Sequence, residues 1–241
     1  MNMREMHYDF KQKLNKIDSQ KNRNLQVPEI DWKLNEAQEI FVKVIAQPRL
    51  RSQLGFEINQ RTIDDIRTIV LNQTPANNNC IQTFNFGDDS FLAQIPEDYW
   101  FFVGGKVYAT KDSCVNVRLS IRPVTHDDEH DVSVFDRSSF EWRIANIRFN
   151  KDGIKIFTDG TFDINLLCLN YIKKPVRIHN AQDFHNGQYE WPDGTLLSGT
   201  QACELPEPVH GEIVDLAVLL TSIDINSPDT QQKQNKVQLT N

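Results

Sequence analysis

The sequence predicts an α+β fold, in which an N-terminal helical layer is joined by a C-terminal helix and a central domain forms an antiparallel β-sandwich or barrel. Apolar residues recur at helical spacing in the first part of the chain. After Asn79 the period falls to two, and helical spacing returns after Leu205. Because no helical pattern separates the strand candidates, we expect the sheets to be antiparallel.

The domain boundary is expected in the segment Asn72–Asn79, which combines a proline with turn-favouring asparagines. The predicted domains are a helical region at 1–75, an antiparallel β domain at 76–206, and a C-terminal helix with a polar tail at 207–241. The tail composition alone favours disorder, and the tail could order against a neighbouring subunit.

Three helices are predicted in the first domain. The first covers residues 3–17, and its apolar stripe consists of Met6, Phe10, Leu14 and Ile17. The second follows "VPEIDW" and runs to about Gln47, because the next residue is a proline. The third opens at "TIDDIRTIV" and is expected to bury Ile63, Ile66 and Val70.

Two segments are the most informative strand candidates. In "VNVRLSIR" the alternation predicts that one face carries Val115, Val117, Leu119 and Ile121. "YWFFVGGKVYAT" is apolar on both sides of a Gly-Gly pair, which favours a hairpin turn.

Composition and charge are those of an ordinary globular protein, with 39% hydrophobic residues and a net charge of −7. Residues 76–241 hold 14 basic and 23 acidic residues. A free-standing nucleic-acid binder usually has the opposite balance, so we expect no specific nucleic-acid binding. An acidic surface would repel DNA, but ordinary solubility explains it equally well.

The four cysteines lie far apart and never form a C-x-x-C pair; they are Cys80, Cys114, Cys168 and Cys203. We interpret them as free thiols in a reducing compartment. The start of the chain lacks the apolar stretch of a secretory signal, and the longest apolar run is too short and too charged to span a bilayer. We therefore expect a chain made in the cytoplasm without a membrane anchor.

The sequence offers no catalytic or cofactor-binding motif. His126 and His130 have H-x-x-x-H spacing and are the candidate metal ligands, but the segment interpreted as a loop need not bring them together. The loop "FHNGQYEWPDG" concentrates aromatic residues, including Tyr189 and Trp191. Such residues contact glycans or proteins in some loops, and more often they pack within the loop.

Both ends of the chain resemble a known family. "DFKQKLNK" (9–16) is followed by "PEIDWKLNEA" (28–37), "YIKKP" occupies 171–175, and "PEPVHGEIVDLAVLLTSIDINSPD" is followed by "KQNKVQLTN". These motifs resemble virion structural proteins of tailed phages, in particular collar and tail ring proteins of crAss-like podoviruses. Residues 80–165 carry no matching motif.

The resemblance implies a non-enzymatic structural protein of the virion, made in the host bacterial cytoplasm and without a cofactor. Its copies would form a dodecameric ring in the neck or tail, a head-to-tail connector between portal and tail, through whose lumen DNA passes. The implied partners are further copies of this chain and neighbouring ring, portal or tail-hub proteins, and no membrane is implied.

Ring assembly needs exposed surfaces that repeat the same head-to-tail contact. We expect five residues to tie the terminal helices into one layer: Phe10, Leu14, Trp32, Leu34 and Phe41. The second group of interface candidates follows a strand and is interpreted as the exposed end of an edge strand; it consists of Tyr171, Lys173, Lys174 and Pro175. The β domain is expected to face outward or toward the next ring.

The sequence leaves two other functions open. The chain could be a virion-attached binding module whose β domain recognises a host glycan or receptor, with an aromatic-lined groove around Tyr189 and Trp191. It could also be a metal-dependent hydrolase centred on His126 and His130.

Overall fold

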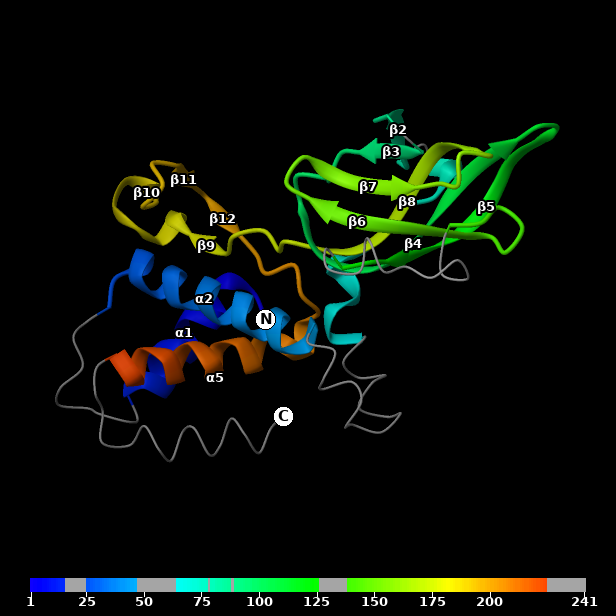
Figure 1. Ribbon diagram of the computed structural model, residues 1–241. Helices are drawn as coiled ribbons and strands as arrows, with labels where there is room; N and C mark the ends of the chain where they lie inside the picture. Colours follow the sequence, from blue (N-terminus) through cyan, green and yellow to red (C-terminus); the bar gives the residue numbers. More distant parts are fainter. Residues whose placement is uncertain (16–24, 47–63, 78, 88, 126–137, 225–241) are drawn as a thin grey trace, which may run out of the picture. The chain divides into compact units, whose positions relative to one another are not determined.

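The computed structural model describes residues 1–15, 25–46, 64–77, 79–87, 89–125 and 138–224. The chain divides into two compact units. One unit combines Met1–Ile69 with Pro175–Asn241, and we call it the helical unit. The other is Val70–Lys174, the β unit (Figure 1). The helical unit is therefore assembled from both ends of the chain.

The helical unit is built on three helices: α1 (Met3–Asn15), α2 (Val27–Ala46) and α5 (Glu207–Asp224). Both N-terminal helices contact α5, as predicted (Figure 1). Helical spacing places Met6, Phe10 and Leu14 on one face of α1, where each is at most 5% exposed. Full burial of such side chains contributes about 1.5–3 kcal/mol each.

The second helix begins earlier than predicted, at Val27 rather than after Trp32. Two features explain the early start. Glu29 accepts a hydrogen bond of 2.8 Å from the backbone N–H of Gln26, as in a capping box. Pro28 lies in the first turn, where a missing N–H removes no helical hydrogen bond.

The predicted third helix is wrong in its second half. A short helical turn at 64–66 continues as the 3-10 helix η1 (Arg67–Ile69), and Val70 begins strand β1 (Val70–Asn72). Val70 pairs with Ile172 of a distant strand, and this pairing outweighs the local helical pattern. Residues 16, 17, 47, 62 and 63 of the predicted helices lie outside the described residues.

Eight strands form the sheet of the β unit: β1, β2 (Ile81–Asn85), β3 (Ser90–Ala93), β4 (Tyr99–Lys111), β5 (Cys114–Pro123), β6 (Ile144–Asn150), β7 (Gly153–Phe157) and β8 (Asp163–Lys173). Pairing of β8 with both β2 and β4 closes the strands from β2 to β8 into a seven-stranded barrel. β1 and β2 follow one another along the same edge of β8.

The barrel is mixed rather than purely antiparallel. β5 and β6 are parallel, with Ser120 opposite Ile144 and Pro123 opposite Ile147. A parallel pair needs a long connection that brings the chain back to the same end of the sheet. The segment 124–143 is that connection. Its sequence shows no helical periodicity, so a parallel pair could not be predicted from it.

The alternation correctly predicted which side of β5 faces the core for three of its four apolar residues. Leu119 is fully buried, and Val117 and Ile121 pack against the barrel core. Val115 instead is 64% exposed. The neighbouring Asn116 has a φ of 58°, which interrupts the pleat and turns the residue before it away from the core.

The Gly-Gly pair does not form a hairpin. Tyr99–Lys111 is one continuous strand, β4, which pairs with β8 along most of its length. A Cβ atom at Gly105 would lie 2.6 Å from Ile121 Cδ1 and 2.8 Å from the carbonyl oxygen of Cys168. The glycine therefore permits close packing within the barrel rather than a turn.

Two cysteines are joined, contrary to the prediction of free thiols. Cys80 and Cys168 form a disulfide, with Cα atoms 4.5 Å apart. β2 and β8 pair antiparallel with Ile81 opposite Leu167, which brings Cys80 opposite Cys168 at the spacing of a non-hydrogen-bonded pair. Cys114 and Cys203 are free.

Candidate functional site

Two short antiparallel strand pairs lie within the helical unit. β9 (His179–Asn180) pairs with β12 (Thr200–Gln201), and β10 (Gln188–Glu190) pairs with β11 (Leu196–Ser198). Together with Pro175–Ile178 they form a layer along α2, which we call the strap, residues 175–201. The strap carries the aromatic loop identified in the sequence.

Asp31 on α2 holds the strap and α1 together. Its side chain is fully buried, and one oxygen lies 2.7 Å from Nε2 of His7 on α1. The other oxygen accepts hydrogen bonds from the Tyr189 hydroxyl, at 2.6 Å, and from the backbone N–H of Asn180, at 2.9 Å. Burial and the bond to Asp31 raise the pKa of Tyr189, which keeps its hydroxyl protonated as the donor.

The next turns of α2 bind the strap backbone. The Asn35 side chain accepts from the N–H of Ile178 at 2.8 Å and donates to its carbonyl at 2.7 Å. One turn later, Gln38 donates to the carbonyl of Val176 at 3.2 Å. Thus Asp31 and Asn35 of the "PEIDWKLNEA" motif have a structural role: they fix an irregular segment whose backbone groups would otherwise be buried without partners.

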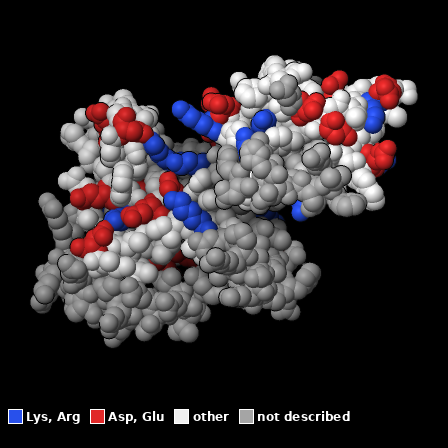
Figure 2. All heavy atoms as spheres, in the orientation of Figure 1, with Lys and Arg blue, Asp and Glu red and all other residues white. Residues whose placement is uncertain are grey.

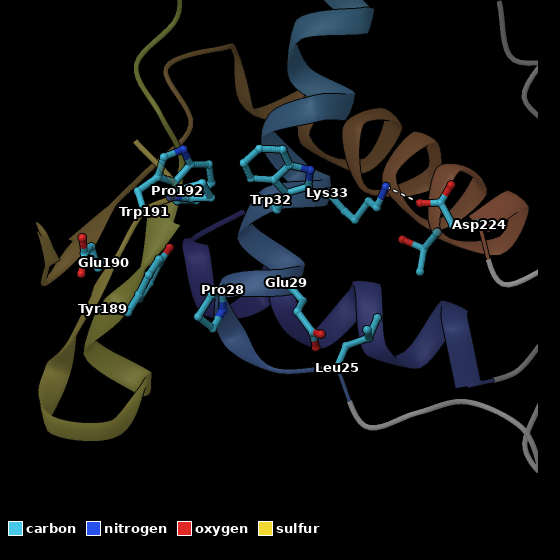
Figure 3. A pocket seen from close by; sticks show the side chains of 11 residues that line it. Leu25, Pro28, Glu29, Trp32, Lys33, Tyr189, Glu190, Trp191, Pro192 and Asp224 are labelled. Carbon is cyan, nitrogen blue, oxygen red and sulfur yellow. Dashed lines mark ion pairs between the residues drawn. The ribbon is translucent and has the colours of Figure 1, made fainter. Parts of the chain in front are cut away.

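A groove opens beside this network, between the first turns of α2, β10 and the end of α5 (Figure 3). We call it the tryptophan groove. Its volume is about 400 Å³, and its walls are formed by Leu25, Pro28, Glu29, Trp32, Lys33, Tyr189, Glu190, Trp191, Pro192, Thr221 and Asp224. Trp32 stacks on Trp191 with ring centroids 5.2 Å apart, and the guanidinium of Arg177 lies 5.5 Å from the Trp191 ring.

The two tryptophans differ in exposure. Trp191 is 7% exposed, whereas Trp32 is 46% exposed although it follows Asp31 in the helix. Tyr189 is also buried, at 7%. The expectation that the aromatic loop packs is therefore correct for Tyr189 and Trp191, and both belong to the helical unit rather than to the β domain.

The charges of the groove are unbalanced. Lys33 Nζ pairs with Asp224 at 2.5 Å and with Glu36 at 2.8 Å. Burial lowers the pKa of Lys33, but the hydrogen bonds to these two carboxylates outweigh it and hold the pKa above its ordinary value. Glu29 and Glu190 are exposed on the groove walls and have no ion pair among the described residues.

The predicted interface residues fall into two groups. Phe10, Leu14, Leu34, Phe41, Tyr171 and Pro175 are buried within the chain, and Trp32, Lys173 and Lys174 are partly or fully exposed. β8 is not an edge strand at its end, because Tyr171 pairs with Leu71 on one side and with Phe102 on the other. Trp32, Lys173 and Lys174 are therefore the candidates whose side chains a partner could contact.

His126 and His130 lie outside the described residues. Among the described residues, no cluster of three or more His, Cys, Asp or Glu side chains could hold a metal ion.

None of the described helices combines the length and apolar character needed to cross a membrane. On the face of the molecule seen in Figure 2, acidic and basic side chains are interspersed over both units.

Sequence reasoning missed Asp31 and Asn35 as structural centres, although both were quoted within the family motif. The signal available was an Asp and an Asn four residues apart among apolar residues of one helix, a spacing that puts both on the same side of the helix, where Asp31 is buried and Asn35 is partly buried.

The family model of phage tail ring protein 3/4 matches residues 1–234, nearly the whole chain. No curated protein matches the chain.

Proposed function

We propose that copies of this chain close into a dodecameric ring between portal and tail, because the chain belongs to the phage tail ring protein 3/4 family of crAss-like phages. The family is one of structural proteins, not enzymes, and its members are components of the virion tail. A ring protein implies homo-oligomerisation. The match over residues 1–234 is the observation that carries the proposal.

The proposed ring has a lumen through which DNA passes, and its neighbours in the virion are further ring, portal or tail-hub proteins. A net charge of −7 is compatible with passage of DNA, since negatively charged surfaces repel phosphate backbones. A closed ring repeats one heterologous contact, so two different surfaces of the subunit must meet.

Exposed aromatic and aliphatic side chains on the β unit support such a contact. Trp142 is 79% exposed, Val115 64% and Phe84 59%. Large aromatic residues are enriched at protein interfaces because they bury much area at little cost in side-chain entropy. We propose that Trp142 is buried against the next subunit of the ring.

Light scattering and negative-stain images of the purified chain, alone and with candidate neighbouring tail proteins, test this proposal. We expect closed rings of about twelve subunits, as a heterologous contact with closing rotation produces. The Trp142→Glu variant should lower the ring fraction while circular dichroism stays unchanged, and Trp142→Phe should preserve rings. A chain that stays monomeric or trimeric with every neighbour, yet binds bacterial surface polysaccharide, would replace the ring with a host-binding module.

A further inference from the structure

The tryptophan groove is open and unfilled by any described residue. Trp32 lines the groove opposite Pro192 and beside Pro28, and 46% of its surface is exposed (Figure 3). Exposed tryptophan on the wall of a concave site is typical of a surface that receives another group. A volume of about 400 Å³ admits a few side chains rather than a folded domain.

The chemistry of the groove selects a cation with apolar neighbours. Three carboxylates line it, those of Glu29, Glu190 and Asp224, against the single ammonium of Lys33. Lys33 already has two carboxylate partners, one of them Asp224. An ammonium entering the groove would lie against Glu29 or Glu190 and beside the Trp32 ring, which attracts cations through its negative face.

The sequence supplies such a segment at the rim of the groove. Asp224 is both a groove residue and the last residue of α5, so residues 225–241 continue from the groove wall. These residues include two cations, Lys233 and Lys236, and the large aliphatic side chains of Ile225, Val237 and Leu239. Lys233 is nine residues beyond Asp224, a reach of about 30 Å at roughly 3.3 Å per residue, which is ample for a return to the groove.

We propose that residues 225–241 dock into the tryptophan groove of their own chain. The ammonium of Lys233 or Lys236 pairs with Glu190 and Glu29, and an adjacent aliphatic side chain covers Trp32. Covalent attachment at Asp224 gives the segment a high effective concentration at the groove, so weak individual contacts suffice. The docking is intramolecular and goes beyond the ring function, on whose outcome it does not depend.

Hydroxyl-radical footprinting of the full chain tests the proposal, with the absolute oxidation rate of Trp32 measured by mass spectrometry. In the unchanged chain we expect Trp32 to be protected well beyond what its 46% exposure in the described structure implies. The K233E/K236E variant should raise Trp32 oxidation several-fold, because the docked cations are lost. The matched control is K11E/K151E, which reverses two exposed lysines that do not line the groove and should leave Trp32 protected.

Carbodiimide cross-linking of a mixture of unlabelled and nitrogen-15-labelled full chains identifies the occupant. We expect links from Lys233 or Lys236 to Glu190 or Glu29 within one isotopic species. Links between light and heavy chains would assign the segment to a neighbouring copy and overturn the intramolecular proposal. Links to the groove from Lys16 or Lys21, or Trp32 oxidation that is equal in K233E/K236E and the unchanged chain, would also overturn it. Ring formation, scored separately, has no bearing on these outcomes.

Discussion

The two units of this chain fix their segments by different means. In the helical unit, side-chain hydrogen bonds from Asp31 and Asn35 hold the strap against α2. In the β unit, backbone ladders close the barrel around an apolar core, and one disulfide joins Cys80, the residue before β2, to Cys168 of β8. The strap has little regular structure, so its backbone groups depend on side-chain partners, whereas a closed barrel pairs its backbone groups between strands.

This contrast indicates where a single substitution has a large effect on the free energy of unfolding. Replacing the side chain at a buried polar centre is costly, because it leaves several buried groups without hydrogen-bond partners. A barrel distributes its stability over many backbone contacts, and it is sensitive mainly where strands approach closely or are covalently joined. Hydrogen exchange measured separately over the two units can test each half of the comparison.

The largest effect is expected from Asp31→Ala. His7, Tyr189 and the Asn180 N–H would all lose a buried acceptor, which should lower the stability of the helical unit by about 3–5 kcal/mol. Exchange should increase in α1, α2 and the strap, and the β unit should be unchanged. Asp152→Ala, at an exposed turn of the β unit, is the control. A loss below about 1 kcal/mol, the scale of one ordinary hydrogen bond, would contradict the central role of Asp31.

Reduction of the Cys80–Cys168 disulfide is expected to have the next largest effect. The bond closes a loop with a sequence separation of 88 residues, and its loss should lower the stability of the β unit by about 2–4 kcal/mol. Dithiothreitol should speed exchange in β2 and β8 and leave α2 unaffected. The Cys80→Ala variant should show no response to dithiothreitol. An equal increase in hydrogen exchange in both units would contradict the proposed difference between them.

The smallest effect is expected at the close contact within the barrel. Gly105→Ala would force its Cβ against Ile121 and the Cys168 carbonyl, and overpacking of this kind costs about 1–3 kcal/mol. Gly104→Ala, one residue earlier in β4, is the matched control, since its Cβ would meet no atom within 4 Å. Denaturant unfolding followed by fluorescence gives both values. Similar losses for the two variants would show that strand propensity, and not the close contact, determines the cost.

The sequence alone determined what depends on neighbouring residues. Helical spacing located α1 and its buried stripe of Met6, Phe10 and Leu14, and alternation located β5 with Leu119 inside. The motifs at both chain ends identified the family. These features follow from periodicity and local composition, which a linear pattern records directly.

Only the tertiary structure decided which distant segments meet. It turned Val70 into a strand opposite Ile172 and placed Cys80 opposite Cys168. In the candidate site, it stacked Trp32 on Trp191 and gave Asp31 its partners, although the sequence had already marked Trp32 and the aromatic loop separately. The physical reason is that strand register and burial of a polar centre are set by long-range packing, and residues far apart in the chain leave no local pattern of their pairing.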